Sequence, residues 1–71
     1  MRGPLARLPV ATVCVSDVSE IVGRRRQVIV AKTGRTVWLP AAEIQIHPGR
    51  VTIPAWLARR IFTGQEIEGG F

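Results

Sequence analysis

The sequence predicts a mainly β protein: a small five-stranded antiparallel sheet, or an SH3-like or OB-like barrel, with one short C-terminal helix. Short runs rich in β-branched residues alternate with turns that contain glycine or proline. Two pairs of these runs are separated by segments short enough to form hairpins. One stretch with helical spacing of apolar residues follows them.

The chain has 71 residues and a hydrophobic fraction of 46%, which is enough for one globular domain. We divide it into a basic N-terminal tail at 1–9, a β core with the helix at 10–64, and a flexible acidic tail at 65–71. Both tails contain glycine or proline and lack a sustained apolar pattern, which is why we expect them to be irregular.

The first strand is expected at Val10–Val18, VATVCVSDV, where β-branched residues predominate. Cys14 is the only cysteine, which excludes a disulfide within the chain, and its apolar neighbours favour a small buried side chain. The segment VGRRR then predicts a basic turn.

The first hairpin is expected within QVIVAKTGRTVWLP, where Lys32-Thr33-Gly34-Arg35 separates two apolar runs. If Lys32 pairs with Arg35, Ile29 meets Trp38 on one side of the ribbon. The other side then holds Val28, Val30, Val37 and Leu39. Both sides are partly apolar, as expected if one packs in the core and the other is covered or used for binding.

The second hairpin is expected in EIQIHPGRVTIP. Pairing across the turn places Ile44 and Ile46 opposite Ile53 and Val51. Pro48 fixes φ at about −65°, so Pro48-Gly49 suits a type II turn.

The helix is expected to follow the second hairpin. Pro54 takes the first helical position, where its missing N–H costs nothing, and Gly64 suits a C-terminal cap. Between the hairpins, Pro40–Glu43 predicts one helical or 3₁₀ turn. The core-facing stripe of the helix is Pro54, Leu57, Ala58, Ile61 and Phe62. The predicted core is Val28, Val30, Val37, Leu39, Ile44, Ile46, Val51, Ile53, Leu57 and Ile61.

Trp56 lies off the apolar stripe, with Arg59 and Arg60 three and four residues further along. Either its ring folds back over the sheet edge beside solvated arginines, or it is a contact surface suited to stacking on bases or anchoring an interface. Trp38 has the same two interpretations: it lies under the helix, or it forms an exposed aromatic patch beside Ile29.

The charge balance favours an anionic partner. Ten Lys and Arg residues stand against five Asp and Glu, a net charge of +5, which suits nucleic acid, an acidic protein surface or anionic lipid. The candidate contact residues for a partner or nucleic acid are Arg24, Arg25, Arg26, Lys32, Arg35, Trp38, Trp56, Arg59 and Arg60.

The residue pattern does not suggest an enzyme. His47 is the single histidine, without a second metal ligand or a nucleophile nearby in sequence, and the five acids form no evident catalytic pair. We expect no metal and no cofactor. No apolar run reaches the length of a membrane span, and no signal peptide is evident, so we expect a cytoplasmic protein without membrane association.

The stretch Val28–Gly64 resembles a pattern in small phage and prophage proteins, "VWLP…VTIPxWLA". Its parts here are TVWLP, AAEI and VTIPAWLARRIF. The relatives look like small β-barrels, so the resemblance implies a mobile-element origin and a bacterial host cell. Such proteins either block a host machine, as anti-CRISPR proteins do, or bind nucleic acid. For a positively charged, non-enzymatic domain of this origin we expect an inhibitor that docks on a host nucleoprotein complex, such as a CRISPR effector, and blocks its nucleic-acid binding. The alternative is a basic DNA- or RNA-binding protein of phage replication or recombination.

Overall fold

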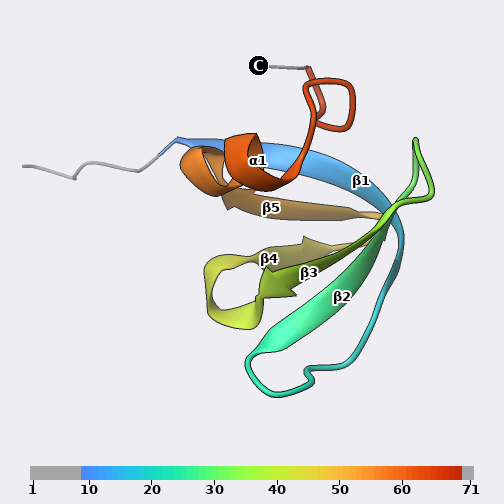
Figure 1. The fold of residues 1–71 in the computed structure, drawn as a ribbon, viewed down its shortest axis with the longest axis vertical. Coiled ribbons are helices and arrows are strands. Elements are labelled where there is room, and N and C mark those ends of the chain that lie inside the picture. Colours follow the sequence, from blue (N-terminus) through green and yellow to red (C-terminus); the bar gives the residue numbers. More distant parts are fainter. Residues whose placement is uncertain (1–8, 70–71) are drawn as a thin grey trace, which may run out of the picture.

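The computed structural model describes residues 9–69 and confirms the mainly β prediction (Figure 1). Five antiparallel strands form one sheet in the order β3-β2-β1-β5-β4, followed by one short helix. The elements are β1 (Val10–Val18), β2 (Arg25–Val30), β3 (Thr36–Pro40), the 3₁₀ turn η1 (Ala41–Glu43), β4 (Gln45–His47), β5 (Arg50–Pro54) and α1 (Ala55–Ile61). The predicted basic tail lies outside the described residues, apart from Pro9.

The long first strand joins two halves of the sheet. Val10–Cys14 pairs with β5, and Val15–Val18 pairs with β2. The register shifts between Val15 and Asp17, and such an irregularity bends a strand and increases its twist. Figure 1 shows β1 curving from the helix around the right side of the molecule to the turn that leads into β2. The first half of β1 therefore pairs with β5 along one edge, and its other edge is not paired with β2.

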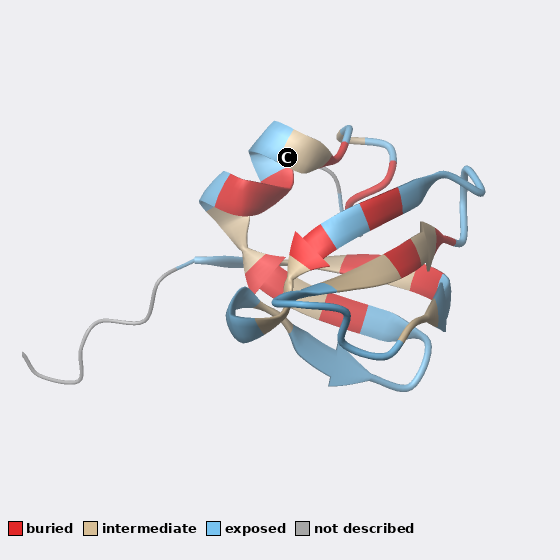
Figure 2. Ribbon diagram, turned by 60° about the horizontal axis from the view of Figure 1, so that its bottom comes forward, coloured by how far each residue is buried: buried red, intermediate tan, exposed pale blue. Residues whose placement is uncertain are grey.

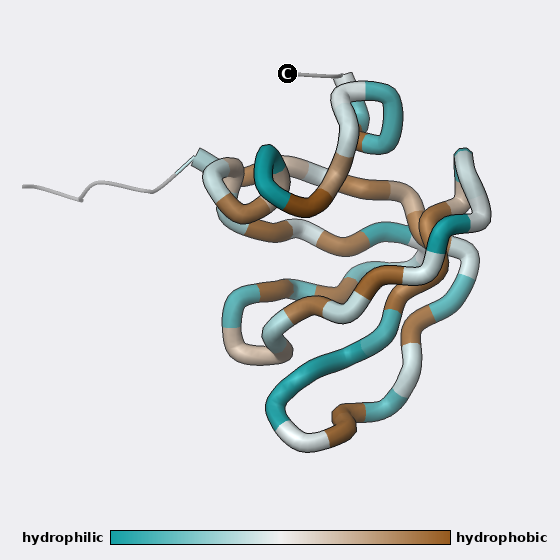
Figure 3. The backbone as a smooth tube through the Cα atoms, in the orientation of Figure 1, coloured by the Kyte–Doolittle hydropathy of each residue, from teal (hydrophilic) through white to brown (hydrophobic). Residues whose placement is uncertain are grey.

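The core follows the alternation predicted from the sequence, as the red bands along the strands in Figure 2 and the brown bands in Figure 3 show. Seven of the predicted core residues are buried: Val28, Val30, Val37, Leu39, Val51, Ile53 and Leu57. Ile44 and Ile61 are partly buried against them. Ile46 is a wrong prediction, because its side chain is 44% exposed. It lies in β4, a three-residue edge strand whose residues are all exposed.

The first hairpin has a longer loop than predicted. Gln27 pairs with Trp38 and Val28 with Val37, which is two residues away from the register that pairs Lys32 with Arg35. The Gly34 N–H donates to the Val30 carbonyl at 2.7 Å, and Gly34 has a φ of 74°, so a four-residue loop closes the ribbon. A shift of two residues leaves each side chain on its predicted side.

The second hairpin has the predicted register, with Ile46 opposite Val51 and His47 opposite Arg50. Gly49 has a φ of 72°, as the second central position of a type II turn requires. The predicted 3₁₀ turn is present as η1.

The helix is shorter at both ends than predicted. Pro54 ends β5 and caps α1 with a ψ of 138°, so it precedes the first helical position. At the other end Phe62 is extended, and its N–H donates to the Ala58 carbonyl at 2.8 Å. Gly64 is therefore not the cap. The predicted core-facing stripe is confirmed for Leu57, Ala58 and Phe62, which are buried. Pro54 and Ile61, its other members, are partly buried.

Part of the segment predicted as a flexible acidic tail, residues 66–68, packs into the fold. Glu66 is 2% exposed and Ile67 is 3% exposed. Ile67 forms a β-bridge with Val13, and the Glu68 N–H donates to the Thr12 carbonyl at 2.8 Å. The segment thus occupies the edge of β1 that β2 leaves open, and the tail prediction is wrong for these residues.

Candidate nucleic-acid interface

The outer face of the first hairpin carries an arginine stacked on a tryptophan. Val28 and Leu39 point into the core, so Arg25, Gln27 and Trp38 project from the opposite side of β2 and β3. The Arg25 Cζ lies 5.2 Å from the centre of the Trp38 ring. The ring is nevertheless 42% exposed. We call Arg25, Gln27 and Trp38 the β2–β3 face.

The basic turn before β2 places its three arginines in different roles. Val22 and Arg25 exchange backbone hydrogen bonds of 2.8 and 3.2 Å around Gly23, whose φ is 67°. Arg24 is exposed in this turn, and its carbonyl accepts the Ala41 N–H at 2.9 Å. The Arg26 Nη1 donates to the Ser19 carbonyl at 2.9 Å and so braces the preceding loop. Arg24 and Arg25 are therefore the members of the triplet that best suit contact with a partner.

Arg35 is engaged within the chain, so we leave it out of the candidate interface. Its Nη2 lies 2.7 Å from Glu66 Oε1, and its Nε donates to Glu66 Oε2 at 3.0 Å. The same Nη2 donates to the Ile61 carbonyl at 2.7 Å, and the guanidinium lies 5.9 Å from the centre of the Phe62 ring. Arg35 thus ties the loop between β2 and β3 to the segment after α1.

Glu66 is a buried carboxylate with several donors. The Arg35 guanidinium holds the pKa of Glu66 at about 2, against an ordinary value of 4.5, although burial alone would raise it. The Thr63 N–H donates at 3.0 Å and the Thr33 hydroxyl at 2.8 Å. Sequence reasoning missed this network, because its groups come from distant parts of the chain.

The predicted residues of the helix lie on a different element from the β2–β3 face. Trp56 is 52% exposed, and Arg59 and Arg60 are exposed as well. Neither Trp56 nor Trp38 is therefore a core side chain. Lys32 is exposed in the loop between β2 and β3.

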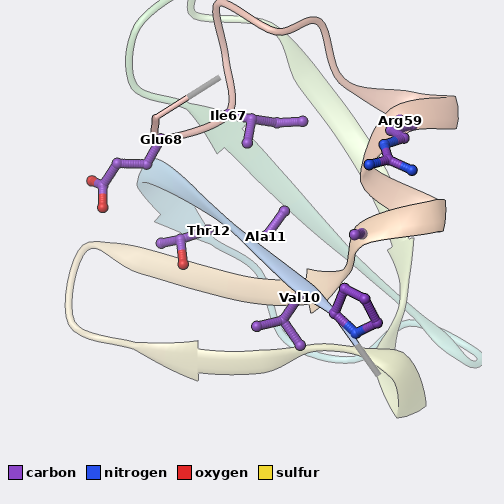
Figure 4. A pocket seen from close by; sticks show the side chains of 8 residues that line it. Val10, Ala11, Thr12, Arg59, Ile67 and Glu68 are labelled. Carbon is purple, nitrogen blue, oxygen red and sulfur yellow. The ribbon is translucent and has the colours of Figure 1, made fainter. Parts of the chain in front are cut away.

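Arg59 lines a hollow of about 320 Å³ between α1 and the C-terminal segment. Figure 4 shows Arg59 on one side of this hollow and Glu68 on the other, with Ala11 and Thr12 of β1 between them. Acidic and basic side chains thus both line it, so a strongly anionic ligand would meet charge of both signs.

Cys14 is half-buried, where the sequence predicted a buried side chain. Its thiol donates to Glu68 Oε2 at 3.2 Å, and this hydrogen bond to a carboxylate raises the pKa of Cys14. A thiol whose pKa is raised is a poorer nucleophile at neutral pH. The contact is consistent with a role in holding the C-terminal segment against β1.

Within residues 9–69, His, Cys, Asp and Glu side chains do not gather in a group of three that could hold a metal ion. The helix described for these residues is too short to cross a membrane.

The fold and this surface define a small curved-sheet protein with an exposed arginine–tryptophan pair beside a basic turn. No family model, curated protein or solved structure matches the chain.

Proposed function

We propose that the protein is a non-enzymatic binding protein whose β2–β3 face holds single-stranded nucleic acid. The observation that carries this proposal is the Arg25 guanidinium over the exposed Trp38 ring, at 5.2 Å from its centre. Unpaired bases stack on aromatic side chains that project from a sheet, and arginines beside them contact the phosphates. The net charge of +5 favours the same class of partner.

The energies favour a base over the arginine as the partner of the ring. A cation–π contact at an exposed site contributes about 0.5–1 kcal/mol, whereas a base stacked on an aromatic side chain contributes about 1–3 kcal/mol. A base can therefore displace Arg25 from the ring. The released Arg25 guanidinium then lies next to the bound nucleic acid, and a phosphate of that nucleic acid can accept its hydrogen bonds. A duplex does not offer such a base, because its bases are paired and stacked on each other.

Replacing Trp38 by alanine should weaken binding of a fluorescently labelled oligothymidine by about 5- to 150-fold, the effect of losing one stacked base. Fluorescence anisotropy at low salt measures this loss. Trp56→Ala is the matched control, because it removes the other exposed tryptophan, on α1, and should leave the affinity unchanged. Absence of binding to any single strand at 50 mM salt would refute the proposal.

The arginines of the basic turn should contribute to the dependence of this binding affinity on salt concentration. If Arg24 and Arg25 each neutralise one phosphate, replacing both by glutamine lowers the slope of log affinity against log salt by about 1.4, given about 0.7 for each contact with a single strand. Arg50, exposed at the start of β5, and Arg60, exposed on α1, replaced together by glutamine, offer a control with the same change of charge. Equal slopes for all variants would exclude the turn from the interface.

A second candidate function is inhibition of a host nucleoprotein complex. Trp56 favours it, because it is 52% exposed on the outer side of a helix whose other side is buried, and exposed Arg60 follows it by one turn. Tryptophan and arginine are the residues that most often dominate protein interfaces. The partner would be a CRISPR effector or a similar complex.

Capture of purified CRISPR effector complexes, followed by competition with target DNA, tests this second function. Binding that blocks target DNA, and that Trp56→Ala weakens by at least about 2 kcal/mol, would support it. If the CRISPR effector still binds target DNA normally when this 71-residue protein is in excess, inhibition is excluded. The two functions are separable, because the first depends on Trp38 and the second on Trp56.

A further inference from the structure

A second hollow, of about 370 Å³, lies between the basic turn and η1. Its walls are largely apolar and are formed by Ile21, Gly23, Arg24, Ala41 and Ala42. The Ala41 N–H donates to the Arg24 carbonyl at 2.9 Å, so the two walls are joined by a backbone hydrogen bond. The hollow is shallow and open to solvent, so it suits one ring system that keeps one side exposed.

The loop that forms one wall is braced by hydrogen bonds. The Gln27 N–H donates to Ser19 Oγ at 2.9 Å, and the Arg26 Nη1 donates to the Ser19 carbonyl at 2.9 Å. Its tip nevertheless exposes apolar side chains, since Ile21 is 53% exposed and Val22 is 58% exposed. A braced loop with exposed apolar groups offers a preformed surface for an apolar ligand.

The hollow lies where β2 begins and β3 ends, next in sequence to Arg25 of the β2–β3 face. Arg24 in its wall is the chain neighbour of Arg25, whose guanidinium covers Trp38. Pro40, which pairs with Arg25, precedes Ala41 in the opposite wall. A nucleic-acid strand that is bound at Trp38 and continues past Arg25 would therefore come to the end of the ribbon where the hollow lies.

We propose that this hollow takes one unpaired base, next to the base that stacks on Trp38. The inference rests on the proposed function and deepens it, because it assigns two adjacent base sites to one strand. The apolar walls suit the faces of the ring, and the Arg24 guanidinium at the wall can stack on a base or contact its phosphate.

The charges around the hollow favour a base inside it over a phosphate. Glu20 and Glu43 are exposed beside the two walls, next in sequence to Ile21 and Ala42. These two carboxylates disfavour a phosphate near the walls, whereas they do not repel an uncharged base. The strand's phosphates should therefore lie toward Arg24 and Arg25, with the base directed into the hollow.

Ala42→Leu tests the inference by filling the hollow from an exposed position of η1. The probe is a four-nucleotide oligothymidine, and the readout is tryptophan fluorescence in a Trp56→Phe background, so that quenching reports on Trp38 alone. We expect Ala42→Leu to weaken binding at least about fivefold, the lower bound for one stacked base, while quenching at saturation stays unchanged. Ala31→Leu, at an exposed position in the loop between β2 and β3, is the matched control and should bind normally.

The outcomes separate the inference from the proposed function. Normal affinity and normal quenching with Ala42→Leu would overturn the inference and leave the proposed function standing. Absence of binding by the unsubstituted protein would overturn both. A dimer in sedimentation that Ala42→Leu dissociates would assign the hollow to a second copy of the chain and also overturn the inference. If circular dichroism shows that Ala42→Leu does not fold, Ile21→Ser removes an apolar wall instead and should weaken binding in the same way.

Discussion

Replacing Arg35 by methionine should lower the free energy of unfolding by about 3–5 kcal/mol, the cost of leaving a buried charge without its partner. Glu66 would remain, with 1% of its side chain exposed, after losing two hydrogen bonds of 2.7 and 3.0 Å from the guanidinium. Methionine retains most of the aliphatic part of arginine, so the loss reports mainly on the charge and its hydrogen bonds.

Glu66→Gln should cost less than Arg35→Met, although it breaks the same ion pair. The arginine that it leaves behind is 46% exposed and can be hydrated, whereas the glutamate that Arg35→Met leaves behind cannot. A glutamine with its carbonyl oxygen at the position of Oε1 can also still accept from the Thr63 N–H, and its amide group can donate to the Thr33 hydroxyl. Urea denaturation of both variants at pH 7 measures the difference. Equal costs, or a larger cost for Glu66→Gln, would contradict this account of the pair.

The ion pair should also make stability depend on pH in acid. The folded pKa of Glu66, about 2, lies below its ordinary value of 4.5, so the unfolded state binds the proton more readily. The stabilisation is therefore complete above pH 4.5 and is lost as the pH falls from there toward 2. Each unit of difference between the folded and the ordinary pKa of Glu66 corresponds to about 1.4 kcal/mol. Because solvent around Arg35 weakens the ion pair, we expect the stabilisation to be about 2–3 kcal/mol. Glu66→Gln should abolish this loss of stability between pH 4.5 and 2. If the free energy of unfolding fell in parallel with pH for Glu66→Gln and the unsubstituted protein, the assignment of the loss to Glu66 would be wrong.

Ile67→Ala should destabilise the protein by about 2–5 kcal/mol, as removal of a buried isoleucine side chain does. Ile67 is 3% exposed and belongs to the hydrophobic core, packed where the C-terminal segment bridges to Val13. In a domain of 71 residues, where the core is small, such a loss is a large part of the total stability.

Ile46→Ala is the matched control for Ile67→Ala, because it makes the same chemical change at a side chain that is 44% exposed in an edge strand. We expect it to cost less than about 1 kcal/mol. Thermal unfolding followed by circular dichroism gives both values. Similar losses for the two variants, or a larger one at Ile46, would mean that the C-terminal segment does not contribute to the core as described.

The strands, the second hairpin and the inward sides of β2, β3 and β5 could be predicted from the sequence because local patterns determine them. Alternation of apolar and polar residues has a period of two in a strand, so Val28 and Val37 face the core even with the hairpin register two residues away from the predicted one. Pro48-Gly49 determines its turn through backbone torsion preferences that act within four residues. The off-stripe position of Trp56 likewise followed from helical periodicity, although its exposure did not.

Other features were decided by the tertiary structure. The sequence around Glu66 has the composition of a loose acidic tail, and its partner Arg35 is 31 residues away. The tail packs because β1 bends away with β2 and leaves an edge at Val13, which Ile67 then covers. The contact between Arg25 and Trp38 depends on a cross-strand register that the loop at Gly34 sets. Contacts of this kind depend on where the backbone brings distant groups together, and no periodicity within a single element encodes that position.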